Sequence, residues 1–298
     1  MKFNFLAGIL VVGLVLSVAL VINKKEFVTH KKIKSSLVKF DVKDFPEHGI
    51  SLIAPSDPSL ADMEVKLTKP KFTSIANSYS AFLKNTGSRA VVGYRIKWEC
   101  VDSRGEVSER DVSNIVSWIF LYGKESDRRM ALNKSMEIIK PDSIWLISLD
   151  SPAQPLESDG NEVAFDTEVA ETIEGCASVT IIADGIFFDD GTFIGPDTTS
   201  FFTEVKSQMD ARYEILRGVQ DDLKAGKEPG EIFRGLEKIR DDESVQLGEQ
   251  PTSDEFRIYF RNLFARDVLG KKELWGGDKA IKEAQVLLSK PWVNLRKL

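Results

Sequence analysis

The sequence has few of the residues on which recognisable catalytic and metal centres depend. Of 298 residues, two are cysteine and two are histidine, His30 and His48. Two cysteines exclude a disulfide-dense scaffold, and two histidines this far apart in a loop-rich segment are more often solvated than ligating. Motifs of serine hydrolases, zinc proteases, phosphate-binding loops and dinucleotide-binding folds are missing. We therefore predict no catalytic residue, no metal site and no cofactor.

Charge is distributed unevenly along the chain. The 40 basic and 46 acidic residues give a net charge of −6, yet residues 1–34 contain six lysines and a single acidic residue. The remaining chain therefore carries −11. A body this acidic is poorly suited to nucleic acid, because contacts with phosphate dominate such binding. Hydrophobic residues make up 42% of the chain, which is enough for a globular core.

Residues 3–22 form an uncharged, mostly apolar run, FNFLAGILVVGLVLSVALVI. At ~1.5 Å per residue, a helix of this length covers the ~30 Å hydrocarbon core of a bilayer. A signal peptide usually has a shorter apolar centre, of ~7–15 residues, before its cleavage site. The only candidate cleavage site is Ser17-Val18-Ala19, inside the run. The run favours an uncleaved single-pass anchor, with a cleaved signal peptide as the alternative.

The signals for membrane orientation disagree. Lys2 favours a cytoplasmic N-terminus and an exported body, whereas the lysines that follow the run favour a cytoplasmic body. Those lysines could instead rest on anionic headgroups, each contributing ~1 kcal/mol. The layout of the N-terminus resembles that of a signal segment, so we predict that the body lies on the extracytoplasmic side.

Residues 35–197 are predicted to form an antiparallel β-sandwich. In 92–100, apolar residues occupy every second position, while Arg95, Lys97 and Glu99 fall on the opposite face of a half-buried strand. The Asp190-Gly191 pair predicts a type I′ hairpin turn, which requires positive φ at both central residues. Further strands are expected at 80–84, 106–108, 115–122, 136–139, 144–149, 163–169 and 179–188.

Residues 198–298 are predicted to be a helical region. Apolar residues recur at helical spacing over 202–223, and Pro229 is suited to start a second helix. Thr252 and Glu255 have the spacing of a capping box that opens a third helix, which Gly270 is expected to end. Asp278 is expected to cap a fourth helix. The predicted fold is thus mainly β plus α: anchor and basic strip (1–34), sandwich (35–197) and helices (198–298).

Parts of the predicted sandwich resemble bacterial exported immunoglobulin-like domains. The resemblance rests on Asn85-Thr86-Gly87, Gly93-Tyr94-Arg95-Ile96-Lys97-Trp98 and Asp102-Ser103-Arg104-Gly105. The later run 186–197, IFFDDGTFIGPD, is similar to a motif in bacterial exported or anchored proteins of unknown function, where a helix follows directly. The resemblance covers about residues 70–225 and implies a fold and a location, but no activity.

Two groups of residues leave alternatives open. Asp184, Asp189, Asp190 and Asp197 around the hairpin could collect a hard cation such as Ca²⁺, or could simply shape the turn and start a helix. Cys100 and Cys176 could form a disulfide that joins two strands, or remain two buried thiols.

The third helix and one loop carry weaker signals. Arg257, Arg261 and Arg266 alternate with aromatic residues, as in a surface for nucleic acid or lipid headgroups, but core aromatics with solvated arginines are the favoured interpretation. Asn133-Lys134-Ser135 is formally a glycosylation sequon.

We expect a non-catalytic, membrane-tethered envelope protein that acts as a protein-interaction or structural module. Its expected partners are the membrane, through residues 3–22, and another protein. The alternative is an anchored hydrolase that uses Asp or Glu carboxylates.

Overall fold

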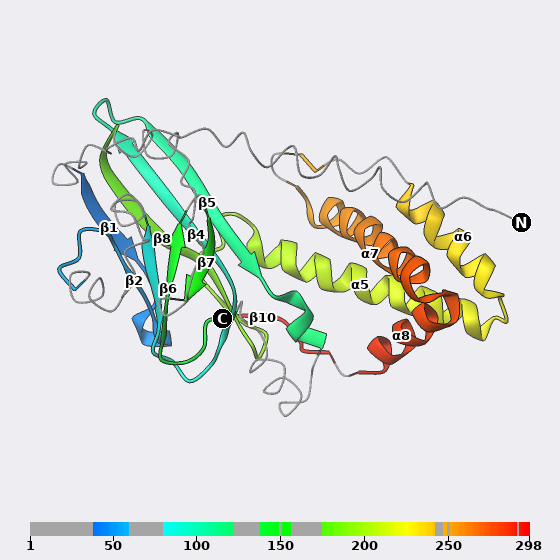
Figure 1. Cartoon of the computed structure of the whole chain (residues 1–298). Coiled ribbons are helices and arrows are strands. Elements are labelled where there is room, and N and C mark those ends of the chain that lie inside the picture. The colour runs from blue at the N-terminus through cyan, green and yellow to red at the C-terminus, as the bar shows by residue number, and fades with distance from the viewer. Residues whose placement is uncertain are drawn as a thin grey trace, which may run out of the picture. The chain divides into compact units, whose positions relative to one another are not determined.

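The chain divides after Lys34 into two units, and the second unit comprises residues 35–298. Within that unit the strands gather at one end and the α-helices at the other (Figure 1). The computed structural model describes residues 38–59, 80–121, 138–148, 151–155, 175–241, 247–248, 251–290 and 292–298. Residues 3–22, the expected anchor, lie outside these ranges. In the described part of the chain, no helix has both the length and the apolar character needed to cross a membrane.

The described elements follow the predicted order of strands before helices, except that the short strand β10 comes after the last helix, within the region 198–298 that was predicted to be helical. The strands are β1 (Lys39–Lys43), β2 (Ile50–Ile53), β3 (Ala81–Asn85), β4 (Val91–Asp102), β5 (Val107–Ile115), β6 (Ser143–Ser148), β7 (Ser151–Pro155), β8 (Cys176–Phe188), β9 (Thr192–Ile194) and β10 (Arg296–Lys297). The α-helices are α5 (Phe201–Lys224), α6 (Pro229–Arg240), α7 (Ser253–Trp275) and α8 (Gly277–Ser289), and short 3-10 helices cover Pro46–His48 and Ser117–Leu121.

The strands form two sheets. One has the order β10-β9-β8-β4-β5, with β1 also beside β8, and the other has the order β2-β3-β6-β7. Most neighbours are antiparallel, as predicted, but β1 runs parallel to β8 and β10 runs parallel to β9. Both exceptions are short strands from near the ends of the described chain, which add to one side of the sheet. The prediction of a wholly antiparallel arrangement was therefore wrong at these two pairs.

The alternating segment is the centre of the larger sheet. β4 pairs with β5 on one side and with β8 on the other, and Ile96 and Trp98 are almost completely buried. The expected strand at 115–122 was wrong: β5 ends at Ile115, and Ser117–Leu121 is a 3-10 helix. Its Ile119, Phe120 and Leu121 are all buried. The continuous apolar run therefore corresponds to a 3-10 helix buried in the core, not to a strand.

The hairpin between β8 and β9 forms where the sequence predicted it, but with a different turn. Of its loop residues, Gly191 has positive φ (81°) and Asp190 does not. The N–H of Gly191 donates to the carbonyl of Phe188, at 2.9 Å. A type I′ turn needs two left-handed residues, so the prediction of that turn type was wrong. Val293 and Asn294 lie so close to Gly191 that a Cβ there would collide with them.

The first turn of α5 packs into the same core as the larger sheet. Phe187, Phe193 and Phe201 are fully buried and touch one another, with ring centroids 4.8–6.4 Å apart. The chain also returns after α8: the N–H of Val293 donates to the carbonyl of Phe120, and β10 joins β9. The helical region is thus fastened to the sheet at both of its ends.

The helix signals were right at the starts of α6 and α7, but wrong at the end of α7 and at the start of α8. Pro229 is the first residue of α6, and Thr252 and Glu255 form the predicted capping box of α7. Gly270 does not end α7, which continues to Trp275 and stops at Gly276, where φ is +87°. Gly276, not Asp278, is also the N-cap of α8. A helix tolerates an interior glycine, but positive φ at Gly276 terminates it.

Of two other expected strands, 136–139 is described in part and 163–169 is not described. Ile139 forms an isolated bridge with Val91, and residues 136–137 lie outside the described ranges. Residues 163–169 also lie outside them.

Candidate functional site

The four aspartates of the candidate cation cluster are held by separate structural partners. Asp184 is completely buried at an irregularity in the pairing of β8 with β4. Its carboxylate accepts hydrogen bonds from the backbone N–H and the hydroxyl of both Thr198 and Thr199, at 2.6–3.1 Å. Burial alone would raise the pKa of Asp184, but these hydrogen bonds outweigh it and lower the pKa below its usual value. Asp184 therefore fixes the loop that leads into α5.

The remaining three aspartates shape the same region. Asp189 accepts from the N–H of Ala90 at 3.2 Å, and Asp197 accepts from the N–H of Phe202 at 2.9 Å, which caps the start of α5. Asp190 accepts from the N–H of Thr192 at 3.0 Å and also contacts two arginines, Arg89 and Arg296. These contacts match the structural reading of the cluster. Among the described residues, no group of three or more potential metal ligands converges.

The polar face of β4 is covered and charged, not solvated. Lys97 is only 6% exposed, and its Nζ lies 3.0 Å from Glu99 and 3.4 Å from Glu109. Burial by itself would lower the pKa of Lys97, but the two glutamates outweigh it and raise the pKa. The period-two pattern correctly places Lys97 on the polar face of β4. The pattern does not indicate that the start of α5 covers this face.

Arg95 links this face of β4 to α5. Its Nη2 donates to Glu204 at 2.8 Å, its Nε lies 3.4 Å from Asp111, and its guanidinium lies 4.6 Å from the centre of the Phe201 ring. Arg95 and Lys97 thus have acidic partners on the described elements around them. We infer that these contacts hold α5 in its orientation on the sheet.

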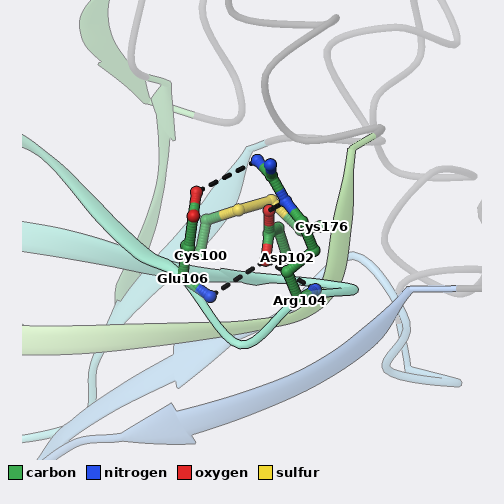
Figure 2. Close-up of a disulfide and its surroundings, with 5 residues drawn as sticks. All are labelled: Cys100, Asp102, Arg104, Glu106 and Cys176. Carbon is green, nitrogen blue, oxygen red and sulfur yellow. Dashed lines mark hydrogen bonds and ion pairs between the residues drawn. A yellow bond between two sulfur atoms is a disulfide. The ribbon is translucent and has the colours of Figure 1, made fainter.

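The two cysteines form a disulfide at the end of β4. Cys100 and the first residue of β8, Cys176, are bonded, with their Cα atoms 5.6 Å apart. The bond lies beside the β4–β5 turn, as Figure 2 shows. In that turn the carboxylate of Asp102 accepts from the backbone N–H groups of Glu106 and Arg104, at 2.9 and 2.8 Å. The N–H of Glu106 contributes most to lowering the pKa of Asp102. The disulfide clamps the two central strands where their pairing ends.

Two of the three arginines of α7 contact α5, and the third, Arg266, is exposed. Arg257 and Arg261 both pair with Glu214 of α5, at 3.0 and 3.2 Å. Phe256 and Phe260 are buried, as the core interpretation requires. For Arg257 and Arg261, this arrangement favours helix packing over a basic-aromatic binding surface.

A groove lies among α5, α6 and α7. Its volume is about 220 Å³, and buried aliphatic side chains of α5 and α6 line it, among them Ile215, Val219, Ile232 and Leu236. Gly218 on α5 and Gly235 on α6 are exposed, and no atom lies within 4 Å of the place where either would carry a Cβ. The groove therefore owes part of its space to missing side chains.

Charged groups mark the two ends of the groove along α5. Glu214 and Arg261 lie at one end and Asp222, two helical turns later, at the other. The sequence patterns did not predict this groove. The signal in the sequence that could have indicated it is a glycine inside each of two helical patterns. A glycine there lowers helix stability, so its presence suggests a role in packing or function.

The other candidate residues lie apart from the groove. His48 is in a 3-10 helix, and its Nε2 lies 3.9 Å from the carboxylate of Glu47. His30 and Asn133 lie outside the described residues. Comparison of the chain with family models, with curated proteins and with solved structures found no match.

Proposed function

We propose that this chain is a membrane-tethered, extracytoplasmic protein that binds another protein through the groove of α5, α6 and α7. The groove is the observation that carries the binding role. Pockets for small molecules usually have volumes of ~300–1,000 Å³, so a groove of about 220 Å³ better suits one or two aliphatic side chains of a partner helix. Its charged ends would fix the direction of that helix.

The disulfide supports the proposed location. Structural disulfides persist in oxidising compartments and are rare in a reducing cytosol. Cys100 and Cys176 are bonded, which is expected for a chain whose apolar run at 3–22 directs the body across the membrane.

We further propose that the two sheets form an immunoglobulin-like sandwich. Antiparallel pairing within β2-β3-β6-β7 and the buried alternate residues of β4 support this. The disulfide adds no support, because it joins neighbouring strands of one sheet, whereas the disulfide of antibody domains joins the two sheets.

The alternative of a carboxylate hydrolase loses its motivating feature. In the acidic cluster that suggested it, Asp184 lies in β8 and the other three aspartates lie in the loops beside β8, β9 and α5. All four accept hydrogen bonds from backbone N–H groups. No observation on the described residues favours it over binding.

Filling the groove tests the binding role. Gly218→Leu places an aliphatic side chain where the partner's would lie, and should reduce chemically crosslinked adducts of the full chain in intact cells by at least about tenfold. The substitution should leave the fold intact, because open space surrounds this position and leucine favours a helix over glycine by ~0.8–1 kcal/mol.

Gly270→Leu is the matched control. Gly270 is also inside a helix, α7, with no atom within 4 Å of its missing Cβ, and it does not line the groove. Adducts should persist in this variant. Adducts that persist equally in the Gly218→Leu variant would contradict the proposed binding site.

A further inference from the structure

The corner between α7 and α8 exposes apolar side chains to solvent. Leu274 and Trp275, the last two residues of α7, are 78% and 45% exposed, and Val286 on α8 is 48% exposed. Buried residues of the same two helices, such as Leu269 and Ile281, already supply their contacts with the core. Much of the surface of these three side chains is therefore not used in packing by the described part of the chain.

Two lysines share this surface. Residues 279, 282 and 286 recur at spacings of three and four, so Lys279, Lys282 and Val286 lie on one side of α8. The Nζ of Lys279 lies 5.0 Å from the centre of the Trp275 ring. Two of the acidic groups nearby pair with other lysines: Glu283 with Lys271, and Glu237 with Lys272. On the described part of the chain, Lys279 and Lys282 thus have no acidic partner.

The charge of this end of the chain is opposite to that of the rest. Residues 271–298 contain seven basic and three acidic residues, a net charge of +4, whereas residues 1–270 carry −10. Two of those acidic residues, Glu273 and Asp278, flank the corner. Four of these basic residues pair with acidic residues outside the segment: Lys271, Lys272, Arg296 and Lys297. The positive charge offered to an anionic surface at this corner therefore comes from Lys279 and Lys282.

We propose that the surface formed by Leu274, Trp275, Lys279, Lys282 and Val286 docks against anionic lipid headgroups. Tryptophan with lysine is the combination found where helices meet the headgroup layer, whereas lysine is depleted from protein–protein interfaces. Each lysine near an anionic bilayer contributes about fivefold in affinity. The inference rests on the proposed tether, since residues 3–22 would keep the body beside a bilayer.

Quenching of Trp275 by acrylamide tests this docking. The full chain is incorporated into vesicles of phosphatidylcholine alone, or with about one-third phosphatidylglycerol, and the Trp275 signal is taken as the difference between the natural chain and Trp275→Phe. We expect phosphatidylglycerol to lower the quenching constant of Trp275 at least twofold, and 0.5 M salt to reverse this, since salt screens surface charges. Lys279→Glu with Lys282→Glu should abolish the protection.

The matched control is Lys224→Glu with Lys227→Glu, which changes the charge equally at exposed lysines elsewhere in the helical region. Protection of Trp275 should survive in it. Equal quenching in both vesicles would overturn the proposal, as would protection by soluble polyglutamate but not by phosphatidylglycerol, which would identify an acidic protein surface as the ligand. Flotation of the full chain with the neutral vesicles measures anchoring through residues 3–22 separately. A failure of the tether is therefore distinguishable from a failure of the docking.

Discussion

Removal of the disulfide by Cys100→Ala and Cys176→Ala together is expected to lower the free energy of unfolding by about 4 kcal/mol. The bond closes a loop with a sequence separation of 76 residues, and in the chain-entropy description such a loop corresponds to about 4.5 kcal/mol. It also joins β4 to β8, and most residues of β8 are buried. Loss of the disulfide therefore removes a covalent constraint on a strand of the core. Urea unfolding of the two proteins measures the difference.

Reduction provides the control for that prediction. Dithiothreitol should destabilise the natural chain by a similar amount and leave the double-alanine variant unchanged. If the double variant were as stable as the natural chain, the disulfide would not be the clamp of β4 and β8 that we infer.

Asp184→Asn is expected to lower the free energy of unfolding by about 3 kcal/mol. The carboxylate is fully buried and accepts hydrogen bonds from four donors on Thr198 and Thr199. The amide group of asparagine would face two of those donors with N–H groups of its own, leaving them unsatisfied. Asp111→Asn, at a 43% exposed carboxylate that pairs with Arg95, is the control and should cost less than about 1 kcal/mol.

The lowered pKa of Asp184 also predicts how stability depends on pH. A carboxyl group whose pKa is lower in the folded chain stabilises the fold fully above its unfolded pKa, about 3.9, and loses that contribution as pH falls through the folded pKa. Between about pH 4.5 and 2.5, the natural chain should therefore lose stability more steeply than the Asp184→Asn variant. Equal slopes in urea unfolding across that range would show that folding does not lower the pKa of Asp184.

Local patterns predicted the parts of the fold that depend on local chemistry. The alternation at 92–100 identified β4, and Thr252 with Glu255 identified the start of α7, because both signals come from residues a few positions apart. β5 escaped detection beyond residue 108 because it is an exposed edge strand with a mostly polar sequence, VSERDVSNI. The apolar run after it matched a strand in composition, yet it folds as a buried 3-10 turn.

Contacts between distant segments account for what the sequence left undecided. Whether Lys97 faces water depends on Thr198 and α5, about a hundred residues away. The groove needs Gly218 and Gly235 to face the same space, which follows from the packing of α5 against α6 and not from either helix alone. The cysteine pair was identifiable as a candidate, but its pairing depends on the register between β4 and β8.

The redox state of Cys100 and Cys176 in living cells tests most directly whether the body of this protein lies outside the cytoplasm. Cells that produce the full chain are quenched in acid, and their free thiols are then labelled with a maleimide-linked polymer that retards the protein on a gel. We predict no shift before reduction and a shift of two labels after it, while a chain that lacks residues 1–34 shows two labels without reduction. Two labels on the unreduced full chain would contradict the extracytoplasmic location.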